Sequence, residues 1–357
     1  MNPPASGDQP SRRGRGAPGN PANRFERFHY ATDEFCEPAD TSSPLPTRLY
    51  PDDTQSIIAY NESPDVGFAA SVNPYRGCEH GCIYCYARPT HEFLGCSAGL
   101  DFETKLFVKY RAAELLAREL HAPGWRPQTL TLSGVTDCYQ PVEGQLKITR
   151  ACLEVLAEFR NPVFIVTKSR LVTRDADLLT ELAGFGAAGV SLSITTLDAA
   201  LARAMEPRAS LPEARLEAVA RLRAAGVPAG VNFAPVIPGL NDHEAAAVLG
   251  AAAQAGAQFA GMTMVRLPLA VAPLFTEWLE RHYPDRKEKI LSRIRSMRDG
   301  KLNSTRFGDR MQGRGPLAEQ IRQMFNVSCR RAGLTHIYPD LSTAAFRRTG
   351  HGQLELW

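Results

Sequence analysis

Short apolar runs alternate with longer amphipathic stretches along most of the chain, beginning near residue 67. The short runs are rich in Val, Ile, Leu, Phe and Thr, which predicts buried β-strands. Strands are expected at residues 67–73, 128–133, 162–167, 189–194, 229–234 and 259–265. Helices are expected between them, near residues 104–120, 146–160, 174–184, 212–225 and 242–255. Strands that alternate with helices are typical of parallel βαβ units. The pattern therefore predicts an α/β protein with a partial (β/α)6 barrel of the TIM type.

The segments that flank this repeat differ from it in composition. The start of the chain is rich in Pro, Gly and Arg and poor in apolar residues, which favours disorder. The segment after the repeat returns to helical periodicity. The predicted organisation is a disordered basic arm, an irregular lead-in, the barrel core, a small helical extension and a C-terminal tail, at residues 1–24, 25–66, 67–270, 271–334 and 335–357.

The charge of the chain is nearly balanced. Its 357 residues carry a formal net charge of +3, and residues 1–24 supply this excess. The composition thus gives no general basic footprint for nucleic acid. Residues 293–314 are a local exception, with few acidic residues among several arginines. This basic stretch suits either a phosphate backbone or an ordinary solvated surface.

The apolar runs are too short for a membrane span, which needs roughly 20 apolar residues. The charged, Pro-rich start also lacks the apolar segment of a signal peptide. Eight cysteines are present, and thiols stay reduced in the cytoplasm. We therefore expect a cytoplasmic protein without membrane contact.

Three cysteines fall within one short loop, Cys78, Cys82 and Cys85, with the spacing Cys-x3-Cys-x2-Cys. Iron–sulfur clusters are held by cysteine thiolates, normally four of them. Three thiolates at this spacing reach three corners of a 4Fe-4S cluster and leave one iron open. An open coordination position is typical of catalytic rather than structural metal sites. The loop therefore predicts a catalytic iron–sulfur centre.

A structural zinc site is the alternative for the same three cysteines. Its fourth ligand would be His80, His91 or Cys96. Zinc sites of this size usually show two Cys-x2-Cys pairs separated by a longer gap, and the sequence has no second pair. On this alternative the protein would be a zinc-containing scaffold without catalytic activity.

Polar residues follow several of the predicted strands. In barrels of this kind the loops after the strands build the active site. One such loop carries Asp137, a second carries Lys168, and a third carries hydroxyl groups near Ser193. A carboxylate, an amine and hydroxyls at one edge would suit a zwitterionic amino acid and a ribose.

The chain resembles the radical S-adenosylmethionine (radical SAM) superfamily, and within it the spore photoproduct lyase-like or DNA repair photolyase-like group. The resemblance spans about residues 70–270. It rests on short matches at residues 82–86, 136–137, 166–168, 193–194, 205–208 and 234–235. It implies a 4Fe-4S cluster on the three cysteines, with S-adenosylmethionine (SAM) at the open iron. Reductive cleavage of SAM would then release a 5′-deoxyadenosyl radical, with flavodoxin or ferredoxin as electron donor.

The same resemblance implies roles for the residues at the strand ends. The SAM site would be lined by Thr136, Lys168, Ser193 and Ala234. Asp137 would hold the methionyl ammonium group, and Tyr86 would contact the adenosyl group.

One departure concerns the hydrogen-donating cysteine of the lyase, because Gly134 stands at its position. Tyr84 and Tyr86 match the tyrosine pair of the lyase, and Cys138 lies four residues after Gly134. Cys138 is either a substitute donor, if its loop folds back, or a structural thiol.

The last five residues, Gln353-Leu354-Glu355-Leu356-Trp357, resemble the peptide by which bacterial repair proteins bind the sliding clamp. Two leucines and a terminal aromatic on a flexible tail can fill a small apolar pocket; the alternative is a tail that folds back on its own domain. Together these features predict a radical SAM enzyme that acts on DNA in repair. Modification of a protein or a small molecule is the alternative, because related barrels serve many substrates.

Overall fold

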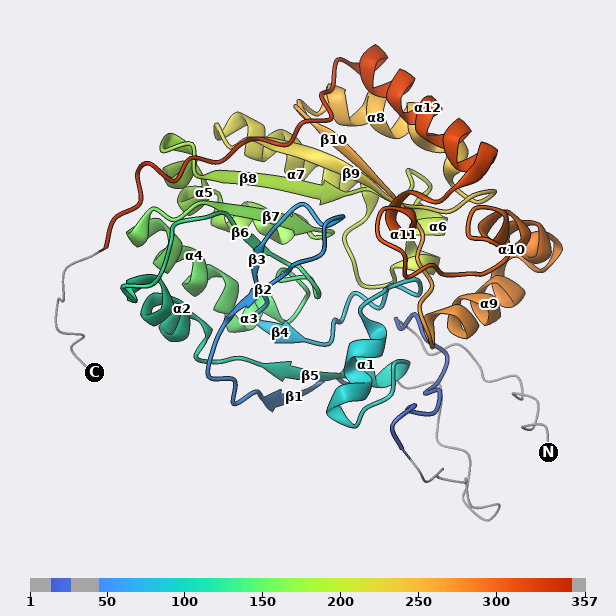
Figure 1. The fold of residues 1–357 in the computed structure, drawn as a ribbon, viewed down its shortest axis with the longest axis horizontal. Coiled ribbons are helices and arrows are strands. Elements are labelled where there is room, and N and C mark those ends of the chain that lie inside the picture. The colour runs from blue at the N-terminus through green and yellow to red at the C-terminus, as the bar shows by residue number, and fades with distance from the viewer. Residues whose placement is uncertain (1–13, 27–44, 349–357) are drawn as a thin grey trace.

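The computed structural model describes residues 14–26 and 45–348, and its main feature is an open, largely parallel sheet (Figure 1). Within the described residues the strand order is β10-β9-β8-β7-β6-β3-β2, and only β2 is antiparallel to its neighbour. All six predicted strands are present. The bounds are β2 Ile58–Tyr60, β3 Ala70–Val72, β6 Leu130–Leu132, β7 Val163–Thr167, β8 Ala188–Ser193, β9 Ala229–Val236 and β10 Ala260–Met264. A parallel sheet that ends at two free edges is the architecture of a partial barrel.

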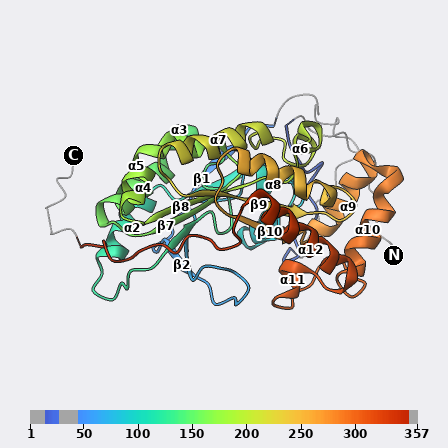
Figure 2. The same ribbon diagram turned by 90° about the horizontal axis from the view of Figure 1, so that it is seen from above.

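One face of this sheet is covered by the predicted helices, and Figure 2 shows α4, α5 and α7 as a layer along it. Successive side chains of a strand point to opposite faces of the sheet. Val163 and Ile165, two residues apart on β7, therefore share one face, and both are fully buried in the main core. The helices are α2 Ala112–His121, α4 Ile148–Phe159, α5 Ala176–Gly184, α7 Pro212–Ala224 and α8 Ala245–Gln254, and the short elements between them are α3 Glu143–Leu146, η2 Arg170–Asp175, α6 Ala199–Met205 and η3 Asp242–Glu244. The helical periodicity is therefore confirmed.

A second, smaller sheet lies where the sequence predicted the first turns of a helix. It has the order β1-β5-β4, with bounds β1 Arg48–Pro51, β5 Lys105–Val108 and β4 Tyr75–Arg76. The prediction of a helix from residue 104 is wrong for residues 105–108. Alternate residues of β5 are buried, and pairing with two strands from distant parts of the chain outweighs local helical preference. The short helices α1 Leu100–Thr104 and η1 Arg88–Leu94 connect this sheet to the cysteine loop.

Residues 14–26 pack against the rest of the protein, although the sequence predicted a disordered arm up to residue 24. The Arg15 guanidinium is buried and donates to the carbonyl oxygens of Glu103 (2.7 Å) and Leu45 (2.6 Å). The Asn23 side chain donates to the carbonyls of Glu92 (2.9 Å) and Cys96 (3.0 Å). These polar contacts offset the conformational entropy that the segment loses on ordering, which its few apolar residues could not offset by burial.

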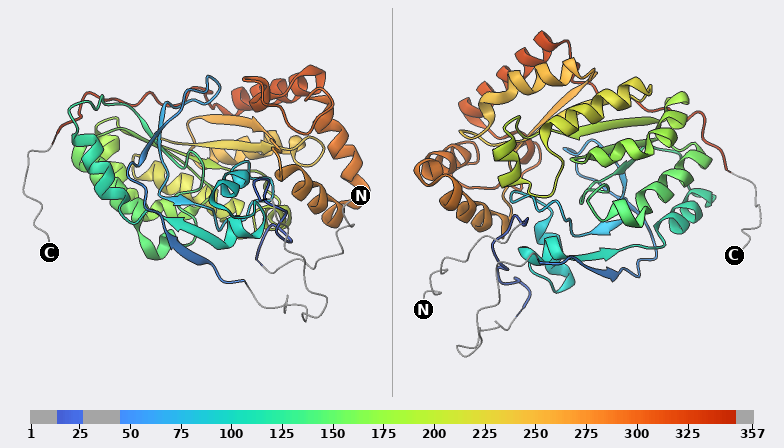
Figure 3. Two further views of the ribbon diagram at one scale, coloured as in Figure 1. Left: turned by 60° about the horizontal axis from the view of Figure 1, so that its bottom comes forward. Right: turned by 180° about the vertical axis from the view of Figure 1, so that it is seen from behind.

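The elements of the helical extension are α9 Val271–His282, η4 Pro284–Arg286, α10 Lys287–Ser296, α11 Asp309–Gln312 and α12 Gly315–Ala332. Within the extension, α9 and α10 lie beyond the carboxyl ends of β8 and β9, whereas α12 packs along α8, as Figures 1 and 3 show from opposite sides. Apolar residues of α9 and α10, including Trp278 and Ile294, form one buried cluster with Cys82, Ile83 and Tyr84. The extension therefore supports the cysteine loop directly.

Residues 335–348 run back across the sheet on the face opposite the main helical layer. Backbone hydrogen bonds join Ala260 to Thr335, Ser342 to Gly186 and Arg347 to Phe159, each at 2.9 Å. The terminal segment at residues 353–357 lies outside the described part of the chain. Among the described residues, no helix combines the length and apolarity that crossing a bilayer requires.

We expect the substitution Gly16→Ala to loosen the N-terminal segment. A Cβ atom at residue 16 would lie 1.8 Å from the carbonyl oxygen of Gly81, so one of the two backbones has to move. Overpacking of this kind costs about 1–3 kcal/mol. Hydrogen exchange measured by mass spectrometry should become faster at residues 14–26 and in the cysteine loop.

The matched control is Gly124→Ala, because no atom lies within 4 Å of the position of its Cβ. Exchange in the Gly16→Ala variant equal to that of the control would show that the close packing of residues 16 and 81 has no structural consequence.

Candidate active site

The three cysteines lie on successive turns of one loop between β4 and η1. Backbone hydrogen bonds close these turns, from Gly81 N to Cys78 O (3.4 Å) and from Cys85 N to Cys82 O (3.1 Å). Gly77 and Gly81 adopt left-handed backbone angles, with φ of 82° and 68°, which glycine accepts without strain. The glycines therefore allow the chain to turn tightly enough to bring the three thiols together.

Cys78 and Cys82 are buried, and Cys85 is half-buried. Burial raises the pKa of Cys78 well above its ordinary value, and that of Cys82 to about 12. Burial also raises the pKa of Cys85. The three sulfur atoms are close enough to influence one another, since Cys82 and Cys85 both raise the pKa of Cys78. Such thiols are neutral and apolar unless a bound metal compensates the thiolate charge.

This donor set fits an iron–sulfur cluster better than a single ion. In the described part of the chain, no three His, Cys, Asp or Glu side chains converge as ligands of one metal ion. A cluster instead takes its cysteines at separate iron atoms. Three thiols on one loop, without a fourth protein ligand among the residues that the structure describes, match that arrangement.

The residues considered as a fourth zinc ligand are engaged elsewhere. His80 Nδ1 lies 3.3 Å from Asp137 Oδ2. His91 lies edge-on to Phe102 and Phe107, with Nε2 2.9 Å from the carbonyl of Lys105. The Cys96 thiol lies 3.8 Å from the carbonyl of Leu94. The structure therefore does not support the zinc-scaffold alternative.

An ion pair beneath the loop fixes its backbone. Arg88 and Glu103 are both fully buried, with Nη2 and Oε1 2.6 Å apart. The same guanidinium donates to the carbonyls of Cys82 (3.0 Å) and Gly81 (3.1 Å). Glu103 also accepts hydrogen bonds from the backbone of Gly16 (2.9 Å). The pair thus joins the N-terminal segment to the cysteine loop.

Gln140 holds the other end of the loop. Its side chain is fully buried, accepts a hydrogen bond from Glu79 N (2.8 Å) and donates to Gly77 O (3.2 Å). Neither this glutamine nor the Arg88–Glu103 pair was identified from the sequence. Their partners are backbone atoms or residues distant in the chain, and only the position of Arg88, three residues after Cys85, was a signal.

Asp137 has a structural environment that the sequence did not predict. Its carboxylate accepts hydrogen bonds from Thr167 Oγ1 (2.7 Å), Lys168 N (2.8 Å) and Tyr139 N (2.9 Å), besides facing His80. Burial acts to raise its pKa, but His80, the backbone N–H of Lys168 and the Thr167 hydroxyl lower it to about 2. Because the chain itself supplies these partners, the geometry favours a role in joining β6, β7 and the cysteine loop over binding of an ammonium group.

A second buried ion pair lies beside Lys168. Glu206 pairs with Arg215, accepts a hydrogen bond from Thr195 Oγ1 (2.5 Å) and also accepts one from Tyr84 OH. Lys168 Nζ lies 5.9 Å from the centre of the Tyr84 ring. Burial opposes the charge of Lys168, but Cys82 and Glu206 raise its pKa above the ordinary value. Lys168 is therefore a protonated amine next to the cysteine loop.

The other three residues predicted to line the SAM site, Thr136, Ser193 and Ala234, have different surroundings. Thr136 donates to the carbonyl of Tyr75 (2.6 Å), and Ser193 is buried while its carbonyl accepts from Arg215 (2.8 Å). The carbonyl of Ala234 accepts from Thr195 Oγ1 (3.1 Å). Ser193 and Ala234 thus lie within hydrogen-bond reach of the Glu206 network, whereas Thr136 points toward β4.

Tyr86 lies at the open side of the loop. Its side chain is 46% exposed, and its hydroxyl donates to the carbonyl of Gly134 (3.0 Å). The guanidinium of Arg266 lies 5.2 Å from the centre of its ring. Tyr86 therefore connects the third cysteine to the loop after β6 and to the end of β10.

Cys138 does not face the cysteine loop. It is fully buried in the main core, in the same cluster as Tyr139, Ile148 and Cys152. Thr149 Oγ1 donates to its carbonyl (2.6 Å) and fixes the backbone there. Its loop does not fold back toward the site, so of the two predicted roles the structure supports that of a structural thiol.

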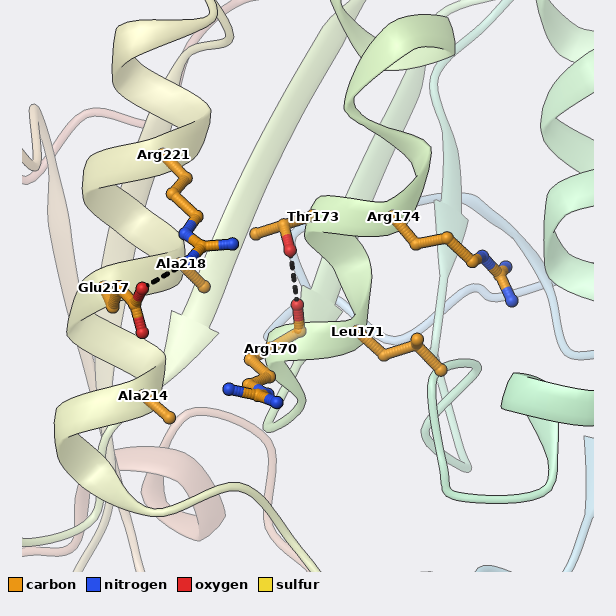
Figure 4. A pocket seen from close by; sticks show the side chains of 8 residues that line it. All are labelled: Arg170, Leu171, Thr173, Arg174, Ala214, Glu217, Ala218 and Arg221. Atoms are coloured by element: carbon orange, nitrogen blue, oxygen red, sulfur yellow. Dashed lines mark hydrogen bonds and ion pairs between the residues drawn. The ribbon is translucent and has the colours of Figure 1, made fainter.

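Two pockets border these elements. One, of about 510 Å³, lies against Glu79 of the cysteine loop and is also lined by Arg15, Thr47 and Arg208. The other, of about 450 Å³, lies between η2 and α7, where Arg170 and Arg221 extend toward its interior (Figure 4). None of the predicted site residues lines this second pocket, which belongs to the helical layer.

Comparisons with known proteins agree with this geometry. A family model described as the radical SAM superfamily matches residues 72–252. An uncharacterised protein of Mycobacterium tuberculosis (strain H37Rv) is 38% identical over 246 residues, which cover 67% of this chain and 71% of the relative. An uncharacterised protein of Methanocaldococcus jannaschii is 31% identical over 173 residues, covering 48% of this chain and 62% of the relative.

Among solved structures, spore photoproduct lyase complexed with dinucleoside spore photoproduct is similar in fold. It superposes with a TM-score of 0.56 at 15% sequence identity, covering 80% of this chain and 81% of the other. At this identity the likeness concerns the fold alone.

The environment of His91 predicts a pH dependence of stability. Burial lowers the pKa of His91 to about 4, whereas its ordinary value is about 6.5. Between these values only the unfolded chain binds the proton, so stability falls as the pH decreases from 6.5 to 4. The contribution of this residue should amount to about 3 kcal/mol.

Urea unfolding at neutral pH and near pH 4.5 measures this loss. The variant His91→Gln should lose less stability between the two pH values than the wild type. His243→Gln, at an exposed position, should behave as the wild type. An equal pH dependence for all three proteins would contradict the assignment of a buried, neutral His91.

Proposed function

The chain belongs to the radical SAM superfamily, and on this premise we propose that it is a radical SAM enzyme that acts on nucleic acid, with a 4Fe-4S cluster on Cys78, Cys82 and Cys85. The observation that carries the proposal is the loop itself, with two buried thiols and one half-buried thiol and, among the described residues, no set of side chains that would hold a single metal ion. When bound, the cluster and SAM supply one-electron cleavage of SAM to a 5′-deoxyadenosyl radical, which abstracts hydrogen from the substrate.

The protein residues hold and orient these groups. Arg88 and Gln140 fix the loop backbone through its carbonyl and amide groups. We assign the protonated amine of Lys168 to the carboxylate of SAM, because it is the cation that faces Cys82 and Glu206 without an ion-pair partner at salt-bridge distance among the described residues. Ser193 and Ala234 remain our candidates for the wall of the SAM site, and Tyr86 for the adenosyl contact.

Nucleic acid is the substrate class that we propose. Support comes from the shared fold with spore photoproduct lyase, which has been solved with a dinucleoside lesion bound. The basic stretch of the extension adds to this support, because Arg298 and Arg310 lie near Arg266 at the end of β10. The lyase reaction itself is not part of the proposal, since Gly134 replaces the hydrogen donor and Cys138 is buried in the core.

Two partners remain predictions. One is an electron donor such as flavodoxin or ferredoxin, which the chemistry of SAM cleavage requires. The other is the sliding clamp, whose proposed contact through Gln353–Trp357 lies outside the described residues.

The first test is anaerobic reconstitution of the wild type and of Cys78→Ser, Cys82→Ser and Cys85→Ser. The wild type should bind about four iron and four sulfide ions per chain and form 5′-deoxyadenosine when reduced in the presence of SAM. Each variant should lose both properties, because the loop offers no replacement thiolate. Iron and sulfide counts and an absorbance spectrum measure the first property, and chromatography measures the second.

Cys96→Ser is the control, since its thiol lies outside the loop, 3.8 Å from the Leu94 carbonyl. A colourless wild-type protein that contains one tightly bound zinc would overturn the proposal.

A second test separates SAM binding from cluster binding. Lys168→Met should keep the iron content of the wild type but bind SAM about tenfold more weakly, because a charge-assisted contact is lost. Lys289→Met removes an exposed lysine on α10 and should leave the iron content and the SAM affinity unchanged. Equilibrium dialysis with labelled SAM gives the affinity. If Lys168→Met binds SAM like the wild type, Lys168 does not contact SAM.

A further inference from the structure

Three arginines, Arg266, Arg298 and Arg310, gather at the carboxyl end of β10 near two carboxylates, those of Asp65 and Asp309. Arg310 forms a two-point contact with Asp65, whose carboxylate also accepts from Gly308 N (3.0 Å). Arg298 is buried and donates to backbone carbonyls, including that of Val265. Arg266 has no carboxylate within salt-bridge distance among the described residues. The group therefore carries more positive than negative charge.

Arg266 is the arginine whose hydrogen-bonding capacity is least used. Its Nε is buried and has no partner in the described part of the chain. Its Nη1 meets the sulfur atom of Met311 at 3.4 Å, and sulfur is a weak acceptor. Burial and the charge of Arg310 both lower its pKa. A guanidinium that is partly desolvated without an anion is costly, and an incoming anion would remove this cost.

The position of Arg266 relates this unused cation to the active site. Its guanidinium lies over the ring of Tyr86, the residue after Cys85, at 5.2 Å from the ring centre. A second aromatic ring, that of Phe307, lies 4.8 Å from the guanidinium of Arg310 and is 56% exposed. Cations beside exposed aromatic faces are typical of surfaces that bind unpaired nucleotides, where phosphates meet the cations and bases stack on the rings.

We propose that Arg266 binds a backbone phosphodiester of the nucleic-acid substrate beside Tyr86, with the exposed ring of Phe307 as a stacking face for a neighbouring base. The inference rests on the proposed function and names the contact by which the substrate is held. The phosphate oxygens accept hydrogen bonds from Nε and the other guanidinium nitrogens of Arg266, which otherwise lack strong acceptors. The contact positions the strand beside Cys85 without reading its sequence.

The pocket in Figure 4 provides a contrast. Its Arg221 pairs with Glu217 (2.5 Å), and its Arg174 pairs with Glu143 and Asp175 (2.7 Å each). The guanidinium of Arg170 is exposed and has no acidic partner among the described residues. Arg170 thus matches Arg266 in charge but lies on η2 after β7 and not at the end of β10, which makes it a suitable control.

The experiment measures binding of a fluorescent single-stranded oligonucleotide of about 12 nucleotides to the full-length protein by fluorescence anisotropy, at several salt concentrations. Arg266→Ala should weaken binding about tenfold and reduce the slope of log affinity against log salt by about 1. Arg266→Lys should retain the salt slope but not the full affinity, because lysine keeps the charge without the planar donors. Arg170→Ala should change the affinity less than about twofold.

Each outcome has a separate meaning. Thermal melting of every variant verifies folding, and Arg266→Gln serves as a second neutral variant if Arg266→Ala proves unstable.

If the wild type binds the oligonucleotide and the neutral variants bind it with the same affinity and the same salt slope, the phosphate contact is overturned but the proposed function stands. A loss of SAM affinity, measured by equilibrium dialysis, without a loss of oligonucleotide affinity would identify the anion as the SAM carboxylate and also overturn the inference. Absence of oligonucleotide binding by the wild type overturns the nucleic-acid proposal and the inference together.

Discussion

The buried pair of Arg88 and Glu103 is the interaction on which the geometry of the site depends. Taking both charges out of water is costly, and such a pair is stable only when its remaining donors and acceptors are satisfied. Here the guanidinium also binds carbonyls on both sides of the loop, including those of Cys82 and Gly99. Glu103 accepts from the backbone of residues 16 and 17 as well. Removing either partner would leave an uncompensated buried charge, at a cost of about 3–5 kcal/mol. The pair thus fixes the path of the loop backbone.

Three distant parts of the chain converge on this loop. The backbone of Ile83 donates to the carbonyl of Met205 (3.0 Å), and that of Arg208 donates to the carbonyl of His80 (3.3 Å). Asp137 joins the same loop to the ends of β6 and β7. The helical extension closes the arrangement through the apolar cluster that contains Cys82. Because parallel strands end at one edge of the sheet, the polar residues after them meet the cysteines, and the fold itself assembles the site.

The sequence predicted the parts of the structure that depend on local periodicity. All six parallel strands and most of the helices follow from the spacing of apolar residues, and the cysteine loop follows from three thiols in one short segment. It could not predict β5, which exists through pairing with β1 and β4 from elsewhere in the chain. The ordered packing of residues 14–26 also depends on acceptors distant in the chain, such as the Glu103 carboxylate. Asp137 shows the same limit, since its residue type suited an ammonium ligand, whereas its hydrogen bonds with Thr167 and Lys168 come from residues distant in the chain.

The difference from the spore photoproduct lyase pattern extends beyond the replacement of one residue. A Cβ atom at Gly134 would lie 3.0 Å from Ser71 Cβ and 3.2 Å from Phe68 Cζ, so a cysteine there would require its neighbours to move. Tyr86 occupies the other side by donating to the Gly134 carbonyl. A side chain larger than glycine at residue 134 would therefore displace Ser71 or Phe68 by a few tenths of an ångström. On the proposed function, hydrogen abstraction near Tyr86 must be followed by a final step that uses no thiol from residue 134 or from the buried Cys138. On this proposal the protein shares the radical chemistry of its superfamily but converts the substrate radical to product by a different last step than the lyase-like pattern implies.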